Sequence, residues 1–259
     1  MFKLHVISFP YLLQNIFKVM EAHQAKFTFP IVASVAAKKP ELTREILNRG
    51  HEVAVHGFKH LNYSFLTERQ QESDIAEALG TFKTMDIPVR GFRAPYNTYA
   101  EATPKLVEKH GFLWDIGLGY NPKYREGTCP FKIKIGNHDS SFVCIPLNSL
   151  SDDLMIDIKG FSSRQMAEAL KRIIRQTSEN GGVVMFDLHP IRIGQPKYVD
   201  ALRQVVMYGT ELNGWFPTVT EAVNYWNKHG SWKHDASFCC LLTGDIDNFS
   251  FFDYLQRLF

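Results

Sequence analysis

The chain has 259 residues, of which 45% are hydrophobic, so it is long enough to bury a sizeable core. Its formal net charge of +2 is close to balance, and no long Lys/Arg run indicates a nucleic-acid partner. No stretch reaches the roughly 18 uncharged apolar residues of a membrane span, and the N-terminus lacks a signal-peptide pattern, so we expect a cytoplasmic protein. Of the four cysteines, Cys239 and Cys240 lie in an apolar run, which favours buried free thiols.

The apolar spacing predicts alternating helices and strands. The first two elements are a helix over 9–23, with one apolar stripe, and a strand over 26–33. Further helices are expected at residues 40–48, from 67 onward, and at 104–110, 162–178, 197–212, 218–229 and 251–259. Further strands are expected at residues 53–55, 89–92, 112–116, 132–135, 181–189 and 236–247. This alternation indicates parallel βα units, so we predict an α/β fold, a closed or nearly closed barrel that forms one domain over 1–259.

Two histidines four residues apart, His56 and His60, are the first sign of a metal site. On one helical turn their imidazoles would point the same way, as the ligands of one divalent ion must. They also follow the predicted strand 53–55, and barrel enzymes place their chemistry at strand ends. In a chain with ten histidines this spacing also arises by chance, so a carboxylate is needed to complete the ligand set.

Other candidate site residues also stand at predicted strand ends. These are Arg93, Asp115 and His189, whereas no carboxylate lies beside the first strand. Two acids occur instead at the far end of the chain, where Asp245 and Asp247 end the last predicted strand. From the residues alone, the alternatives are that His189 is a core histidine and that Arg93 is a surface ion-pair partner.

Five segments, in order, resemble the polysaccharide deacetylase family (carbohydrate esterase family 4). The lead-in over 26–50 is similar to the family, and His56-Gly-Phe-Lys-His60 resembles its metal-binding motif. Arg93-Ala-Pro-Tyr96 looks like its arginine motif, and Leu188-His189-Pro190 like its final motif. Gly111-Phe-Leu-Trp-Asp115 looks like the motif between them, although Ile116 replaces a usually small residue. The resemblance runs from about residue 12 to 229 and implies a distorted (β/α) barrel.

The opening motif of that family, a strand ending in two carboxylates, is displaced in this chain. Asp245-Ile-Asp247 is similar to its Val-Asp-Ile-Asp form, found in the branch related to imide and amide hydrolases. We therefore interpret the chain as circularly permuted, with the first strand moved to the C-terminus, where it would close the barrel. The alternative is a C-terminal appendage whose acids cap a helix, which would leave a metal-poor pseudoenzyme.

The resemblance implies a metal centre and a general base. Asp247, His56 and His60 would bind a divalent ion, for which zinc is expected, and the ion would polarise the acyl carbonyl. Asp245 would act as the general base. Arg93 would orient Asp245, because a guanidinium pairs bidentately with a carboxylate.

The remaining motif residues would complete catalysis and substrate binding. His189 is the expected general acid, and Asp115 would hold His189 in the required tautomer. The backbone N–H of Tyr96 would bind the oxyanion, Leu188 would line a small acyl pocket, and Trp114 would line a substrate groove. All of these roles are implied by the resemblance to the family's motifs, and the composition of the chain does not indicate them.

The implied activity is removal of an acetyl group from an N-acetylated sugar or glycan precursor. Two alternatives stay open at this point. One is a hydrolase of the same fold that acts on a cyclic imide or formyl amide, and the other is a catalytically silent carbohydrate-binding protein. The sequence predicts a small-molecule or glycan partner, leaves a homo-oligomer open, and does not identify the substrate or the metal.

Overall fold

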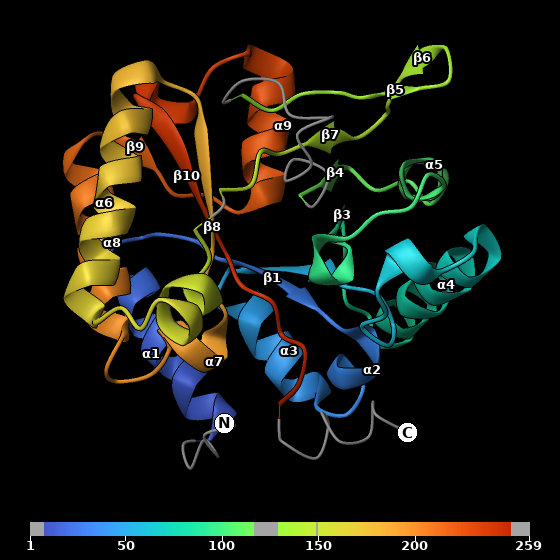
Figure 1. Ribbon diagram of the computed structural model, residues 1–259, viewed down its shortest axis with the longest axis horizontal. Coiled ribbons are helices and arrows are strands. Elements are labelled where there is room, and N and C mark those ends of the chain that lie inside the picture. The colour runs from blue at the N-terminus through green and yellow to red at the C-terminus, as the bar shows by residue number, and fades with distance from the viewer. Residues whose placement is uncertain (1–7, 117–128, 149, 250–259) are drawn as a thin grey trace.

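The computed structural model describes residues 8–116, 129–148 and 150–249, which alternate between helices and strands (Figure 1). The strands are β1 Thr28–Ile31, β2 Glu52–Val55, β3 Gly91–Phe92, β4 Trp114–Asp115, β5 Lys134–Ile135, β6 His138–Asp139, β7 Val143–Cys144, β8 Val183–Asp187, β9 Gly214–Trp215 and β10 Phe238–Thr243. The α-helices are α1 Phe9–Ala22, α2 Ala33–Ala36, α3 Pro40–Asn48, α4 Glu68–Thr84, α5 Thr103–Lys109, α6 Ser163–Asn180, α7 Pro190–Ile193, α8 Val199–Glu211 and α9 Val219–His229. Short 3-10 segments are η1 Tyr63–Phe65, η2 Pro95–Asn97 and η5 Lys233–Asp235, and η4 Leu154–Ile158 is a π-helix. The helix expected over 251–259 lies outside the described residues.

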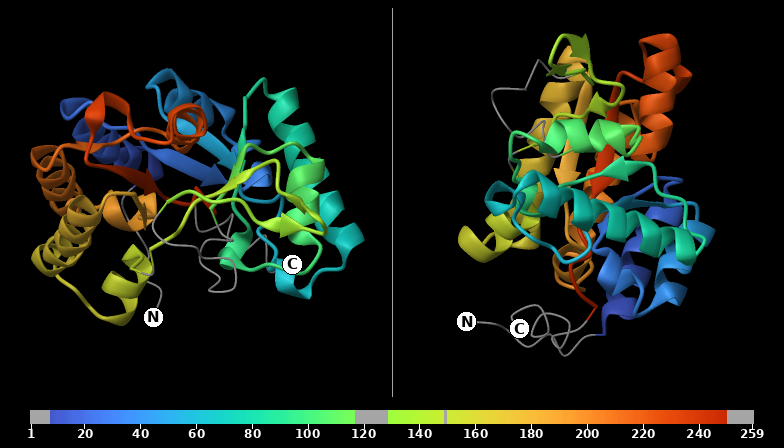
Figure 2. Two further views of the ribbon diagram at one scale, coloured as in Figure 1. Left: turned by 90° about the horizontal axis from the view of Figure 1, so that it is seen from above. Right: turned by 90° about the vertical axis from the view of Figure 1, so that its right-hand side faces the viewer.

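One parallel sheet organises the molecule. Its strand order is β7-β4-β3-β2-β1-β10-β8, with β9 beside the start of β10. Beyond β7, the Asn148 N–H donates to the Met185 carbonyl at 3.1 Å, and Ser151 forms a parallel bridge with Asp187. These contacts turn the sheet back towards β8, and Figure 2 shows its curled form with helices around it. The predicted α/β barrel is therefore confirmed.

The last strand in sequence, β10, lies in the middle of this sheet. Thr243 is paired with Thr28 of β1, and Ile246 continues the contact by a bridge to Ile31. On its other side, β10 pairs with β8 from Cys239 to Thr243. All six residues of β10 are buried, and Cys239 and Cys240 are free thiols, as predicted.

Local sequence signals explain where the longer helices begin. Thr67, Ser162 and Thr218 form capping boxes at the starts of α4, α6 and α9, where side-chain oxygens accept otherwise unpaired N–H groups. The strand expected over 26–33 ends earlier, at Ile31, because the alanine-rich segment that follows forms α2. Within the described ranges, none of the helices combines the length and apolar character needed to cross a membrane.

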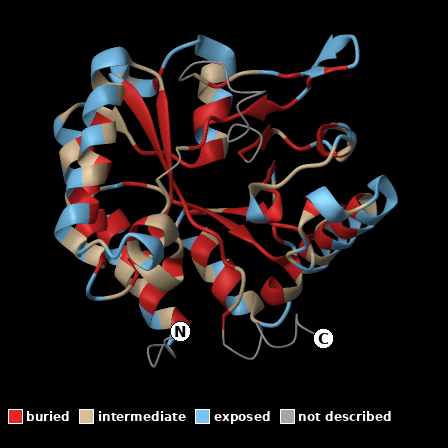
Figure 3. Cartoon of the chain, in the orientation of Figure 1, coloured by how far each residue is buried: buried red, intermediate tan, exposed pale blue. Residues whose placement is uncertain are grey.

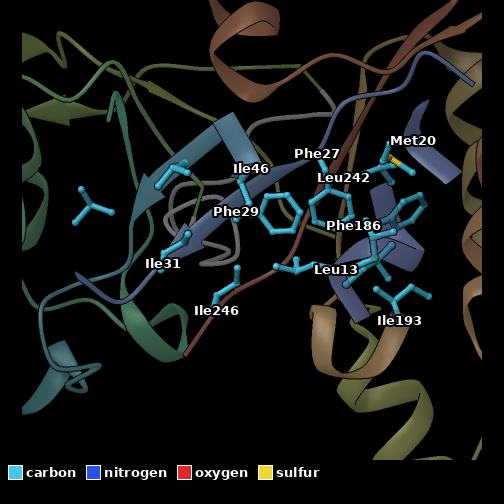
Figure 4. Close-up of a cluster of buried hydrophobic side chains, with 14 of the residues drawn as sticks. Leu13, Met20, Phe27, Phe29, Ile31, Ile46, Phe186, Ile193, Leu242 and Ile246 are labelled. Atoms are coloured by element: carbon cyan, nitrogen blue, oxygen red, sulfur yellow. The ribbon is translucent and has the colours of Figure 1, made fainter. Parts of the chain in front are cut away.

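Alternating side chains give the sheet two apolar faces, both buried (Figure 3). On β10, Cys240 and Leu242 join the main cluster, which α1, α3 and α7 cover; Figure 4 shows Phe27, Phe29 and Ile246 packed there. Cys239 and Leu241 point the other way, into a smaller cluster with Trp114 and α9. Because alternate residues of a strand point to opposite faces, only the residues on the same face as Cys239 and Leu241 can reach the inside of the barrel.

Helix α9 closes the barrel at the amino ends of its strands. The Val219 N–H at the start of α9 donates to Thr28 Oγ1 at 3.1 Å, and the Thr220 N–H donates to Glu52 Oε2 at 3.1 Å. Thr28 and Glu52 are the first residues of β1 and β2. The carboxyl ends of the strands therefore lie at the opposite end of the barrel, where the candidate site residues follow.

Candidate metal and catalytic site

Polar and charged residues gather at the carboxyl ends of four parallel strands. His56 directly follows β2, Arg93 follows β3, Asp187 ends β8, and Asp245 and Asp247 come just after β10. Because neighbouring parallel strands end at the same edge of a sheet, these side chains meet although they are far apart in sequence.

The two histidines are brought together by a loop rather than by a helical turn. Residues 56–60 have no helical structure, Gly57 has φ +71°, and His60 has φ +55°. Their imidazole centroids nevertheless lie 4.9 Å apart. The expectation of a shared helical turn was therefore wrong: β2 runs on to Val55, and a reversal of the chain returns His60 beside His56.

His56, His60 and Asp247 form a cluster that could hold a metal ion. Asp247 Oδ1 lies 3.5 Å from His56 Nε2 and 3.3 Å from His60 Nε2. Asp245 Oδ2 lies 3.3 Å from the same His56 nitrogen. Two imidazoles and a carboxylate are a ligand set typical of zinc and similar divalent ions.

The tautomer of His56 tests whether this cluster fits a cation. His56 Nδ1 lies 2.8 Å from the Arg93 carbonyl, which can only accept, so Nδ1 carries the proton. Burial, reinforced by His60 and opposed by Asp247, lowers the pKa of His56 to about 3, which keeps the ring neutral. Its Nε2 lone pair then faces carboxylate oxygens and has no hydrogen-bond partner among the described residues. A cation between these atoms would remove that repulsion, so the residues fit a metal.

Arg93 pairs bidentately with a carboxylate that the sequence analysis had not considered. Its Nη1 donates to Asp187 Oδ1 at 3.0 Å, and its Nη2 donates to Asp187 Oδ2. Asp245 Oδ1 also lies 3.0 Å from Nη1, so Arg93 does contact the predicted base, but through one nitrogen only. The bidentate pairing expected with Asp245 is therefore corrected to Asp187.

Burial and the neighbouring charges shift the pKa values of Asp187 and Asp245. Burial raises the pKa of Asp187, but the Arg93 guanidinium and His189 outweigh it and bring this pKa below its usual value. Burial raises the pKa of Asp245 well above its usual value; Arg93 opposes the rise, and repulsion from Asp187 adds to it. In the metal-free protein the two carboxylates therefore differ in how readily they lose a proton.

His189 is held by Asp152 rather than by Asp115. His189 Nδ1 lies 2.7 Å from Asp152 Oδ1, and Asp152 is fully buried. Burial lowers the pKa of His189, but Asp187, Asp152 and Asp245 outweigh it and raise this pKa well above its usual value. Such a histidine carries a proton on both nitrogens near neutral pH, with Nδ1–H donated to Asp152.

Asp115 lies on the other face of the sheet, which is why the predicted contact with His189 is absent. Its neighbours in register are Phe92 and Cys144, both in the main apolar cluster outside the barrel. There the Tyr99 hydroxyl donates to Asp115 at 3.0 Å. Trp114, one residue earlier, points inward instead.

The three predicted substrate contacts have different surroundings. Trp114 is fully buried, and its Nε1–H donates to Thr220 Oγ1 at 2.8 Å at the α9 end of the barrel. The predicted place of Trp114 in a substrate groove is therefore wrong, because inward residues near the strand starts pack against α9. Tyr96 is 61% exposed, and its ring centroid lies 4.4 Å from that of His60. Leu188 is fully buried, and its contact with an acyl group stays a prediction.

Two of the acids at this site were missed from the sequence. Asp187 had a usable signal, because it lies two residues before His189 and alternate strand residues share a face. Asp152 had none, since it lies in a segment between β7 and α6 that lacks apolar periodicity. The structure also brings Asp74 of α4 to the histidine loop, where its carboxylate accepts backbone N–H groups.

The fold and this site define a (β/α) barrel protein with paired histidines and carboxylates at the strand ends, a metal-competent arrangement. Residues 9–113 match the polysaccharide deacetylase family. Over this part of its length, the chain is therefore similar to that family.

Individual relatives and solved structures are also similar to the chain. A peptidoglycan deacetylase of Helicobacter pylori is 30% identical over 99 residues, which are 38% of this chain and 32% of the relative. The chain thus spans about a third of that relative's length. A structure described as a probable polysaccharide deacetylase from Pseudomonas aeruginosa PAO1 has a TM-score of 0.73 at 20% identity, covering 86% of this chain and 74% of that one. The structure of Puue allantoinase has a TM-score of 0.72 at 20% identity, with the same coverage of 86% and 74%.

Proposed function

We propose that this protein is a metal-dependent hydrolase that removes the acetyl group from an N-acetylated sugar or glycan precursor. The observation that carries the proposal is the meeting of His56, His60 and Asp247 beside the Arg93–Asp187 and His189–Asp152 pairs. Similarity to the polysaccharide deacetylase family over residues 9–113 supports the same chemistry. The three ligand residues would hold a divalent ion, for which we propose zinc, and such an ion supplies polarisation of the acyl carbonyl and activation of water.

The roles of the other residues follow from what they contact. Asp245 lies beside both Arg93 and His56, and a cation held by the neighbouring ligand residues would favour its ionised form, which can accept the proton of an attacking water. Arg93, held by Asp187, keeps the Asp245 carboxylate in place. His189, doubly protonated and held through Nδ1 by Asp152, can deliver a proton from Nε2 to the leaving amine.

The substrate contacts and the cellular location remain predictions of the sequence. We propose that the Tyr96 backbone N–H assists at the oxyanion and that Leu188 bounds the acyl group. Relatives named for peptidoglycan deacetylation support an N-acetylated sugar as the substrate class. We further propose that residues 1–259 act as one cytoplasmic catalytic domain.

A second candidate is hydrolysis of a non-sugar C–N bond, such as that of a cyclic imide or formyl amide. The Asp245-Ile-Asp247 pattern favours it, and the fold is as similar to an allantoinase as to a deacetylase. A silent carbohydrate-binding protein is less well supported, because it would have no use for a buried neutral imidazole whose free nitrogen faces carboxylates.

The decisive test compares two substrates and one variant. Purified protein loaded with zinc should release acetate from an N-acetylated chitooligosaccharide, and Asp245→Asn should abolish this release while zinc binding remains. Ring opening of a cyclic imide without acetate release would favour the second candidate. Absence of both reactions in a zinc-loaded protein would favour the silent protein.

We also propose that β10 takes the place of the family's opening strand, which makes the chain a circular permutant. Its position between β1 and β8, and the contact of the Phe9 and Phe249 rings at 5.1 Å, support this interpretation. A relinked chain that joins residue 259 to residue 1 and opens between Gly230 and Ser231 should bind zinc as the wild type does. A folded permutant without zinc affinity would contradict it.

A further inference from the structure

The loop between the two metal-site histidines is fastened on both of its sides. The carbonyls of Gly57 and Phe58 accept the N–H groups of Ala33 at 3.0 Å and Ser34 at 3.2 Å, at the start of α2. The N–H groups of Phe58 and Lys59 point the other way and donate to a single carboxylate. Backbone groups that would otherwise stay unpaired are therefore used to hold the loop.

That carboxylate belongs to Asp74, in the middle of α4. Asp74 Oδ2 accepts from the Phe58 N–H at 2.9 Å, and Oδ1 accepts from the Lys59 N–H at 3.2 Å. The Tyr63 hydroxyl also donates to Oδ2, at 2.8 Å. Asp74 is only 6% exposed and forms no ion pair with any described residue. A buried carboxylate without a cation is costly unless hydrogen bonds compensate it, and here all three donors come from residues 58–63.

The backbone of the loop is adapted to this carboxylate. Gly57 has φ +71°, a conformation that side chains disfavour, and a Cβ there would lie 2.7 Å from Asp74 Oδ2. His60 has φ +55° without being glycine, so its conformation must be imposed by its surroundings. The hydrogen bonds of Asp74 supply that constraint immediately before His60.

We propose that Asp74 is a positioning residue that sets metal affinity by fixing His60 relative to His56 and Asp247. This inference depends on the proposed metal site and deepens it. Without the carboxylate, the loop would have several conformations, and the ligand geometry would have to be ordered at the moment of binding. The expected consequence is weaker metal binding in a protein that still folds.

The test measures zinc affinity by competition with a chelator on purified, metal-free protein. Asp74→Asn keeps the shape of the side chain, and we expect it to weaken zinc binding about 10-fold or more, as loss of an outer partner of a metal site commonly does. Tyr63→Phe removes one donor and should weaken binding about threefold. Glu77→Gln neutralises an exposed acid on the same helix and should leave the zinc affinity unchanged.

A second control separates positioning from general destabilisation. Val205→Ala truncates a fully buried residue of α8 and should lower stability while leaving zinc affinity intact. Equal zinc affinity in wild type and Asp74→Asn would overturn the inference, as would an equal weakening by Val205→Ala. If Asp74→Asn does not fold, wild-type affinity in Tyr63→Phe overturns it. A wild type without zinc affinity would remove the proposed function itself, which is a distinct result.

Discussion

The two halves of the site are built on opposite electrostatic principles. In the ion-paired half (Arg93, Asp187, His189 and Asp152), each charge faces an opposite charge at hydrogen-bond distance. In the metal half (His56, His60 and Asp247), the Nε2 atoms of both imidazoles lie 3.3 to 3.5 Å from a carboxylate oxygen of Asp247. The first half is held together by its own opposite charges, whereas the arrangement of the second half fits a cation.

We therefore expect the ion-paired half to contribute mainly to the stability of the fold, and the metal half to contribute mainly to the proposed catalysis. Removing one member of a buried ion pair leaves a charge uncompensated, and the folded state then loses stability. In the metal half, His56 is neutral and its Nε2 has no hydrogen-bond partner among the described residues, so its removal leaves no opposite charge uncompensated. The metal half should therefore affect stability mainly through the ion it binds.

The largest expected effect is in the ion-paired half. Asp187→Ala should lower the free energy of unfolding of the metal-free protein by about 3 kcal/mol, because Arg93 loses its bidentate partner inside the barrel. Urea unfolding in the presence of a chelator measures this change. Asp247→Ala is the matched control and should cost less than about 1 kcal/mol. Equal losses in the two variants would contradict the comparison.

Zinc should stabilise the protein through the metal half. At a free zinc concentration 100 times the Kd, the free energy of unfolding should rise by about 2.7 kcal/mol. Asp247→Ala should lose at least about 10-fold in zinc affinity, so the same zinc concentration should raise its stability much less. Thermal unfolding with and without zinc measures both. An identical zinc effect in this variant would exclude Asp247 as a ligand.

Asp152, which belongs to the ion-paired half, can be compared directly with Asp115, which lies outside it. Asp152→Asn should lower kcat about 10-fold with little change in KM, a part of what general-acid catalysis contributes. Asp115→Asn should change kcat less than about twofold, because Asp115 faces away from the site. Acetate release from an N-acetylated chitooligosaccharide gives both values. If Asp115→Asn lowered kcat more than Asp152→Asn does, the original prediction that Asp115 holds His189 would be supported instead.

The last prediction concerns the pH dependence of stability. The pKa of His56 in the folded metal-free protein, about 3, lies below its unfolded value, so stability present above pH 6.5 is lost as pH falls from 6.5 towards 3. The pKa of His189 is raised, so its contribution is present below pH 6.5 and is lost as pH rises through the folded pKa. Each slope is at most about 1.4 kcal/mol per pH unit.

The measurement is the difference in unfolding free energy between wild type and a glutamine variant at each pH. This difference matters because His51, buried elsewhere with a pKa lowered to about 4, adds to acid sensitivity in all variants. His56→Gln should reduce the loss of stability on the acid side, and His189→Gln should reduce it on the alkaline side. If both variants reduced the loss of stability on the same side of neutral pH, the predicted contrast between the two halves would be refuted.

The sequence was sufficient where the signal was local. The apolar periodicity located α1, and the alternation of elements indicated the parallel barrel. The strand that carries Asp245 and Asp247 was also located, because its apolar run ends on two acids. Its position between β1 and β8 follows from topology, which periodicity does not contain.

The sequence failed where a side chain's direction decided the outcome. Trp114 and Asp115 both lie at the predicted strand, but one points towards α9 and the other leaves the barrel altogether. With two described residues in β4, no alternation was long enough to assign the faces. Asp152 and Asp74 act through contacts between distant segments, and neither has a motif that would single it out.

The central position of β10 also has a consequence for how the protein is made. During synthesis, β1 leaves the ribosome early, but the strand that covers one of its edges follows only after residue 238. Until then, the hydrogen-bonding groups on that edge of β1 are open to wrong partners, a known hazard for nascent parallel sheets. The same interval lacks Asp247, so a nascent chain cannot capture metal with the full ligand set. Completion of the proposed metal site is therefore tied to β10, and a chain that ends before this strand would be prone to misfolding and would lack Asp247.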